Sequence, residues 1–124
     1  MNAIDLSKII INRSSAKGIV DLSNKKLQKL LYYVQAWTLV FYNKKAFNDD
    51  IEAWVHGPAV ASVYRLYRDF AYNPIPLTMA NSIDDIDDDI SSVVNDVIRV
   101  YGKFDANYLE ALTHAEEPWQ TARG

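Results

Sequence analysis

One long apolar pattern constrains the fold of this chain more than any other feature. From Ser23, whose hydroxyl is suited to cap a helix N-terminus, apolar residues recur at helical spacing as far as Tyr42. The stripe consists of Leu27, Leu30, Leu31, Val34, Trp37 and Phe41, widened by Tyr33, Leu39 and Val40. The second half of the segment is therefore apolar on nearly all sides, which is typical of a helix in the middle of a bundle. The pattern predicts a central helix over about residues 23–42, roughly 30 Å long, with its tryptophan in the core.

Shorter helical patterns lie on both sides of this segment. Each combines a recurring apolar face with residues that start or stop helices, such as the glycine at position 18. An acidic run, residues 82–90, connects two of them. The predicted helices are residues 3–16, a third segment from Pro58 to the break at residues 73–76, a fourth at about residues 90–101, and a fifth from Asp105 or Asn107, followed by one last turn opened by Pro118.

Between the central and third helices the pattern changes to short β-type runs. The sequences KAF and IEAWV flank NDD, which suits a small hairpin. Pro58 suits the first position of the next helix, because its missing N–H would be unsatisfied there anyway. We therefore expect a hairpin over about residues 45–55, with Phe47 and Trp54 on the face that packs on the central helix. The whole chain, residues 1–124, is expected to form a single mainly α domain, a helical bundle around the central helix.

The charge balance and the lack of cysteine narrow the function. The chain has 13 Lys and Arg against 16 Asp and Glu, for a net charge of −3, which argues against a nucleic-acid partner. With no cysteine, it has no disulfide, thiol nucleophile or thiolate zinc site. The start does not resemble a signal peptide, and the longest apolar run is shorter than the roughly 20 residues of a membrane span. We expect a soluble cytoplasmic protein with no membrane partner.

Two patterns have the spacing of metal sites. His114 and Glu117 have the i, i+3 spacing found in carboxylate-bridged di-metal bundles, but no second such pair is present. Alternating aspartates at residues 85–89 mimic the opening of a calcium loop, but Ile90 occupies the position that requires glycine. The sequence favours a solvated helix end for the first pattern and a charged helix N-terminus for the second. Neither a metal nor another cofactor is expected.

His56 is the candidate for acid–base chemistry, since it lies at a predicted strand end beside a Gly-Pro turn. Ser62 and Glu52 are the nearest candidates for a nucleophile and an orienting acid, but neither lies in a nucleophile motif. A structural imidazole is therefore favoured over a catalytic one. A basic corner on the central helix is interpreted as a solvated helix end, with phosphate binding as the alternative. Its members are Lys25, Lys26 and Lys29.

A longer pattern over residues 22–67 is more specific than any of these. A Leu-Gln-Lys-Leu-Leu-Tyr-Tyr segment is followed by Ala-Trp, a loop with a phenylalanine, Ile-x-Ala-Trp, a Gly-Pro turn and Val-Tyr. The pattern, with its elements in this order, resembles that of the Panacea-domain family of SocA-like and phage GepA-like antitoxins. The residues that carry the resemblance are Leu27, Gln28, Lys29, Leu30, Leu31, Tyr32, Tyr33, Ala36, Trp37, Phe47, Ile51, Ala53, Trp54, Gly57, Pro58, Val63 and Tyr64, with Pro118 and Trp119 near the C-terminus.

The resemblance implies a non-enzymatic antitoxin of a bacterial or prophage toxin–antitoxin pair. Such a protein would neutralise a cognate protein toxin, encoded next to it, by direct binding. One alternative is an adaptor that delivers the toxin to an ATP-dependent protease. A small hydrolase or metal-dependent enzyme using His56 or His114 is the other alternative. Relatives in the family continue past the Pro-Trp region, whereas this sequence stops at Gly124, so we expect either a short member or a trimmed chain.

The expected toxin-facing surface is the hairpin tip and one face of the third helix. Tyrosine and arginine residues placed off the apolar stripes are the types that dominate binding hot spots. Two aspartates in the predicted hairpin loop join them. The candidate partner-binding residues are Tyr32, Asp49, Asp50, His56, Arg65, Tyr67 and Arg68.

Overall fold

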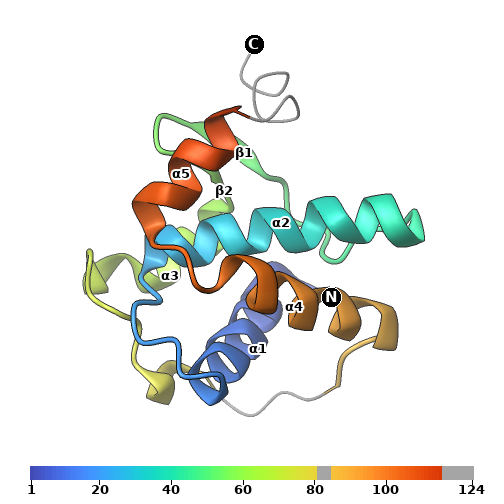
Figure 1. Ribbon diagram of the computed structural model, residues 1–124, viewed down its shortest axis with the longest axis horizontal. Coiled ribbons are helices and arrows are strands. Elements are labelled where there is room, and N and C mark those ends of the chain that lie inside the picture. Colours follow the sequence, from blue (N-terminus) through green and yellow to red (C-terminus); the bar gives the residue numbers. More distant parts are fainter. Residues whose placement is uncertain (81–84, 116–124) are drawn as a thin grey trace.

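The computed structural model describes residues 1–80 and 85–115, which are arranged around one long helix (Figure 1). The elements in chain order are α1 (Ala3–Ala16), α2 (Asn24–Tyr42), β1 (Glu52–Trp54), β2 (Gly57–Ala59), α3 (Ala61–Tyr67), the short 3-10 helices η1 (Arg68–Phe70) and η2 (Leu77–Met79), α4 (Asp88–Tyr101) and α5 (Ala106–Ala115). The prediction of a mainly α fold with one small hairpin is confirmed. Within the described ranges, no helix is both long and apolar enough to cross a membrane.

α2 spans the predicted segment because both of its ends are capped. The Ser23 hydroxyl accepts a hydrogen bond from the Lys26 N–H at 3.3 Å. At the other end Asn43 adopts a left-handed φ of 53° and its N–H donates to the Leu39 carbonyl at 3.0 Å. Asparagine tolerates this conformation better than most residues, so the helix stops there.

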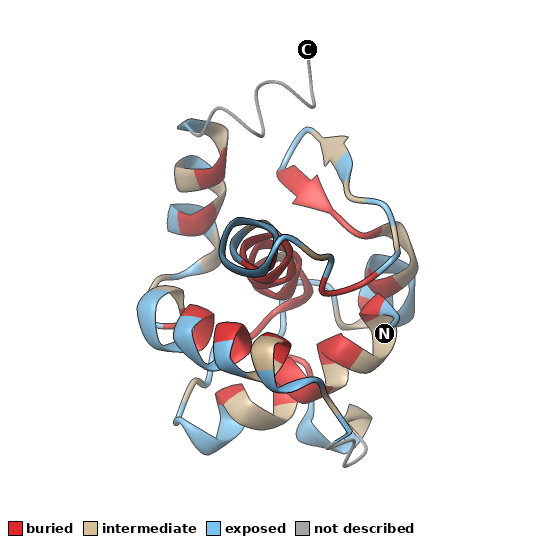
Figure 2. Cartoon of the chain, turned by 90° about the vertical axis from the view of Figure 1, so that its right-hand side faces the viewer, coloured by how far each residue is buried: buried red, intermediate tan, exposed pale blue. Residues whose placement is uncertain are grey.

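The other elements pack around α2, which Figure 2 shows end-on in the middle of the molecule. α1, α3, α4, α5 and β2 all contact it. The apolar stripe of its first half, including Leu27, Leu30 and Leu31, is fully buried. Burying each such side chain contributes about 1.5–3 kcal/mol, so this stripe forms the centre of the core.

The two helices next to α2 are also fixed by local capping. Asn2 caps α1 through the Asp5 N–H at 2.8 Å. Asp87 caps α4, accepting from the N–H groups of Asp89 at 2.8 Å and Ile90 at 3.2 Å. The acidic run therefore ends in a helix N-terminus, as predicted, where the helix dipole favours carboxylates.

The hairpin differs from the prediction in position. β1 pairs with β2 in antiparallel register, Trp54 opposite Gly57, so Val55 and His56 form the turn. The expected hairpin over residues 45–55 is wrong, and Pro58 lies in a strand instead of opening α3, which begins at Ala61. Proline is tolerated in an edge strand of this kind, because an N–H on the side away from the partner strand would make no hydrogen bond within the sheet.

A glutamine of α2 holds the loop that the sequence suggested was a strand. The Gln35 side-chain oxygen accepts from the N–H groups of Ala46 at 2.8 Å and Phe47 at 3.2 Å, and its amide nitrogen donates to the Phe47 carbonyl at 2.9 Å. All three residues are buried. These bonds replace the strand partners that the loop lacks and place the Phe47 ring in the core.

Replacing Gln35 with alanine should destabilise the fold by about 2–4 kcal/mol, since it leaves buried backbone groups without partners. Urea unfolding followed by circular dichroism measures the change. Thr38→Val is the matched control on the same helix, because the buried Thr38 hydroxyl only donates to the Val34 carbonyl at 2.6 Å, an acceptor within the helix. It should cost less than about 1 kcal/mol. Equal losses for the two variants would show that Gln35 does not hold the loop.

Candidate functional site

Polar side chains from the first turns of α2 hold the hairpin and α3. The Gln28 side-chain oxygen accepts from the Val60 N–H at 2.7 Å, and its amide nitrogen donates to the Asn24 side chain at 3.0 Å. Asn24 in turn donates to the Tyr64 carbonyl at 3.0 Å. This chain of hydrogen bonds fixes the direction in which the strand enters α3.

Two lysines of the predicted basic corner are buried, so that interpretation is wrong for them. Lys26 and Lys29 are 0% and 2% exposed. Lys26 Nζ donates to Asp21 Oδ1 at 2.7 Å and to the Gly102 carbonyl at 2.6 Å, whereas Lys29 Nζ donates to the Pro58 carbonyl at 3.1 Å. Their long apolar stems pack in the interior while their ammonium groups find oxygen acceptors, which residue-type periodicity does not anticipate.

The burial of Lys29 lowers the pKa of its ammonium group. Loss of solvent lowers its pKa from 10.5 to about 8, an effect that nearby Glu110 opposes and nearby Lys25 reinforces. The ammonium therefore stays mostly protonated at neutral pH, but at a cost in free energy.

Glu110 of α5 joins the hairpin turn to α2. Its Oε1 lies 3.0 Å from Lys25 Nζ and 3.2 Å from His56 Nδ1. Burial alone would raise the pKa of Glu110, but Lys25 and His56 outweigh it, so the pKa is lowered. No sequence pattern pointed to Glu110, which stands alone in the fifth predicted helix with no motif around it.

The residues nominated for catalysis do not come together around His56. Ser62 Oγ donates to Asp49 Oδ2 at 3.0 Å, and Glu52 accepts from Trp54 Nε1 at 3.2 Å. The acid beside His56 is Glu110, and the imidazole is largely exposed. His114 lies in α5, while Glu117 falls outside the described residues. Among residues 1–80 and 85–115, no group of three or more His, Asp and Glu side chains is placed to hold a metal ion.

A hollow of about 530 Å³, called here the polar hollow, lies where these elements meet. Lys25 and Lys29 of α2 and Arg68 of η1 bring positive charge to it, beside the imidazole of His56 in the turn. It is lined by Asn24, Lys25, Gln28, Lys29, Trp54, His56, Gly57, Ala59, Tyr64, Arg68, Ala71, Tyr72 and Asn107. Several residues that carry the family resemblance therefore line the polar hollow and do not lie only in the core.

The predicted partner-binding residues fall into three groups. Tyr32 and Tyr67 are buried, so their expected place on the surface is wrong. The Tyr67 hydroxyl lies 3.0 Å from Ser7 Oγ, and burial raises its pKa although the Ser7 hydrogen bond opposes this. Asp49 has a structural role, accepting from the Ala3 N–H at 2.9 Å as well as from Ser62. The exposed members are Asp50, His56, Arg65 and Arg68.

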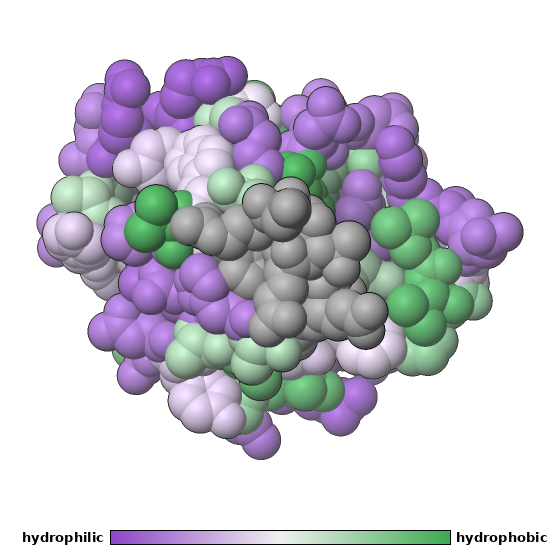
Figure 3. Space-filling view, turned by 90° about the horizontal axis from the view of Figure 1, so that it is seen from above, coloured by the Kyte–Doolittle hydropathy of each residue, from purple (hydrophilic) through white to green (hydrophobic). Residues whose placement is uncertain are grey.

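The end of α2 carries a second candidate surface, called here the α2 patch. Trp37, predicted to lie in the core, is exposed, and Val40 and Phe41 are 67% and 63% exposed. Hydrophobic atoms gather over this end of α2 at the right of Figure 3. The patch consists of Trp37, Leu39, Val40, Phe41 and Tyr42 of α2 and Val100 of α4.

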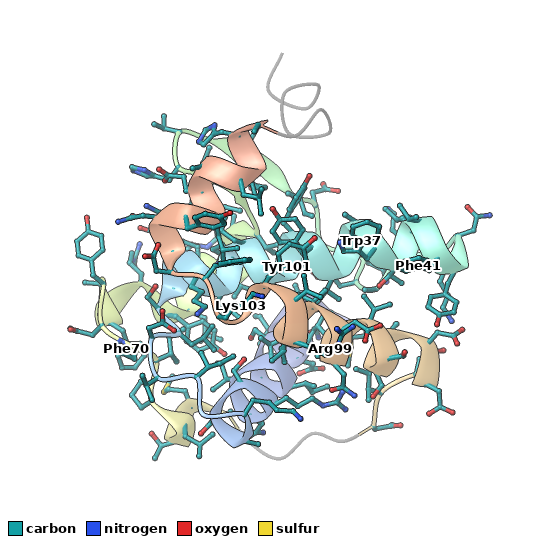
Figure 4. All side chains as sticks on the ribbon, viewed as in Figure 1. Trp37, Phe41, Phe70, Arg99, Tyr101 and Lys103 are labelled. Carbon is teal, nitrogen blue, oxygen red and sulfur yellow. The ribbon has the colours of Figure 1, made fainter. Side chains whose placement is uncertain are left out.

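An aromatic stack connects the α2 patch to the core. Buried Tyr33 stacks on Tyr101 of α4 with ring centroids 3.9 Å apart, and Trp37 Nε1 donates to the Tyr101 hydroxyl at 3.0 Å. Trp37 then stacks on Phe41 at 5.3 Å (Figure 4). Between these rings and α4 lies a shallow groove of about 210 Å³, with Val97 and Val100 in its wall and Asp96 and Arg99 among its polar lining. The stack fixes the rings of an exposed surface in place.

Gly57→Ala should destabilise the protein more than Gly18→Ala, by at least about 1 kcal/mol, in urea unfolding. Both glycines have positive φ, +106° and +79°, so alanine strains the backbone at either position by about 1–2 kcal/mol. Only at Gly57 would the new Cβ meet side chains, with Lys29 Cε at 3.0 Å and Thr113 Oγ1 at 3.1 Å, whereas Gly18 has nothing within 4 Å. Equal costs would show that contact with Lys29 is unimportant.

The stability of the protein should rise with pH between about pH 8 and about pH 9.5. Because the pKa of Lys29 is about 8 when folded and 10.5 when unfolded, the unfolded state binds more protons in this window. The gain should reach about 1–2 kcal/mol. Lys29→Met should flatten this part of the profile, whatever its effect on absolute stability. Urea unfolding across the window measures both slopes, and parallel slopes for the two proteins would contradict the assignment to Lys29.

Comparison with known proteins identifies the family. The family model described as "Antitoxin SocA-like, Panacea domain" matches residues 27–120. Antitoxin SocA of Caulobacter vibrioides (strain NA1000 / CB15N) is 29% identical over 132 residues, an alignment that covers 96% of this chain and 69% of that protein. No solved structure matches the chain. Since the family match extends over well more than half of the sequence, the protein belongs to the SocA-like, Panacea-domain antitoxin family.

Proposed function

We propose that the protein neutralises a protein toxin by binding it directly, as a stoichiometric inhibitor in the cytoplasm. Membership of an antitoxin family supports the toxin as partner, and the name of the Caulobacter relative agrees with it. The observation that carries the mechanism is the α2 patch. A helix whose first two-thirds lies in the core continues into an uncovered, apolar end.

The composition of the α2 patch suits a protein interface. Monomeric proteins rarely expose neighbouring large apolar side chains, and such clusters mark interaction sites. Tryptophan, tyrosine and phenylalanine supply three of its members, the residue types that are enriched at the centres of interfaces. The hydrogen bond to Tyr101, whose ring stacks on Tyr33, holds Trp37 in position before binding, which reduces the entropy lost on association.

Charged pairs border the apolar centre. Lys44 Nζ lies 3.0 Å from Asp89 Oδ2 and 3.1 Å from Asp87 Oδ2, and hydrogen bonds to these two carboxylates raise the pKa of the lysine. Arg99 pairs with Asp96 at 3.2 Å on α4. An apolar centre with a polar rim is the usual arrangement of a protein–protein interface.

A co-expression experiment tests this proposal. The neighbouring reading frame is induced with and without the protein, growth is recorded, and the two purified proteins are passed together over a size-exclusion column. Rescue with co-elution, at an unchanged toxin half-life, is expected for a direct inhibitor. Rescue without a stable complex but with faster loss of the toxin would instead favour the protease-adaptor alternative. Failure of both rescue and co-elution would remove the proposal.

Val40→Ser combined with Phe41→Ser should weaken toxin binding at least about 30-fold and abolish growth rescue. Both side chains are exposed, so the free energy of unfolding should change by less than about 1 kcal/mol. Val20→Ser is the control, since Val20 is 83% exposed and lies outside the α2 patch. Should the double variant lose only self-association, as measured by light scattering, while it still rescues growth, the patch would be a contact between copies of this chain.

A further inference from the structure

We propose that the polar hollow is a receptor for an acidic side chain that the protein partner presents. This inference rests on the proposed function for the identity of the partner. It adds a second contact at the opposite half of α2 from the α2 patch, with a different chemistry.

The lining of the polar hollow is one-sided in charge. Lys25, Lys29 and Arg68 line it together with His56, and among residues 1–80 and 85–115 no aspartate or glutamate lines it. The chain as a whole has a net charge of −3, so this local excess of cations runs against the general composition. A recessed cluster of like charges concentrates the field that attracts an anion.

Two of these cations have capacity left for a ligand. Lys29 Nζ carries three potential donors and donates one to the Pro58 carbonyl. Its lowered pKa shows that its charge is poorly compensated, and a carboxylate in the hollow would relieve that cost. Arg68 is exposed, and within the part of the chain that the structure describes its guanidinium has neither an ion pair nor a hydrogen bond. Arginine offers a planar fork that matches a carboxylate.

Glu110 shows how a carboxylate is bound at the edge of this cluster. One of its oxygens lies within 3.2 Å of both Lys25 and His56. Glu110 itself does not line the hollow. The incoming group would face Lys29 and Arg68, which Glu110 does not contact.

The remaining wall favours a protein side chain over a nucleic acid. Trp54 and Tyr64 form an edge-to-face pair with centroids 5.0 Å apart, and Tyr72, 90% exposed, adds a third ring. Rings beside the cations suit the apolar stem of a glutamate or a neighbouring aromatic residue. The net negative charge of the chain opposes a phosphate backbone, whose binding depends on many cations along a track.

Nuclear magnetic resonance with two capped peptides tests the inference. The probes are acetyl-Gly-Glu-Tyr-Gly-amide and its glutamine counterpart, titrated into the nitrogen-15-labelled full chain. Saturable shifts at Gly57, His56 and the Trp54 indole are expected with the glutamate peptide, weakening as salt is added. Equal affinity for the glutamine peptide, or no saturable shift at millimolar concentration, would overturn the inference. Tighter binding of a single-stranded oligonucleotide would also overturn it.

A matched pair of arginine variants separates the hollow from general surface charge. Arg68→Ala should weaken the glutamate peptide about tenfold. Arg65→Ala removes the same charge from exposed Arg65, which does not line the hollow, and should leave affinity unchanged. Equal effects of the two variants would contradict the inference. If the peptide does not bind but the protein still co-elutes with the toxin, only this inference is wrong. If the protein and the toxin do not form a complex at all, the proposed function is wrong.

Discussion

Hydrogen bonds from buried polar side chains of α2 determine how the remaining segments are placed. Gln28 reaches the start of α3, Lys29 reaches β2, and Gln35 holds the loop before the hairpin. Each of these side chains serves backbone groups that no regular element satisfies. A buried backbone group without such a partner would cost about 1–3 kcal/mol. The central helix is therefore both the apolar core and the template for the irregular segments around it.

This dependence explains which parts of the fold could be predicted from the sequence. α1, α2 and α4 were predicted with nearly correct ends, because capping by Ser23 or Asp87 and the apolar periodicity act within a few residues. The hairpin was misplaced, because its register depends on side chains of α2 that lie about thirty residues earlier in the chain. Pro58 fitted a helix start by local rules, but the Lys29 contact to its carbonyl holds it in a strand.

The candidate sites were harder to predict than the fold for a related reason. Lysine and tyrosine have both a long apolar part and a polar end, so their type alone did not show that Lys29 and Tyr67 are buried. The exposure of Trp37 had a signal that was available: α2 has 19 residues, while α1 and α4, the longest helices against it, have 14 each. A helix longer than its neighbours must leave one end uncovered. No local sequence pattern predicted the polar hollow, because its lining comes from α2, the hairpin turn and η1, which are distant in the chain.

The separation of framework and surface along α2 has an evolutionary consequence. The side chains that hold the fold together lie in the first two-thirds of the helix, whereas Leu39, Val40 and Phe41 near its end are exposed. Exchanges at these exposed positions are therefore nearly neutral for folding, so selection by a partner can act on them without a compensating change elsewhere. Members of a family with this fold can therefore adapt to a changing partner through substitutions at the exposed end of α2, while the residues of the core stay the same.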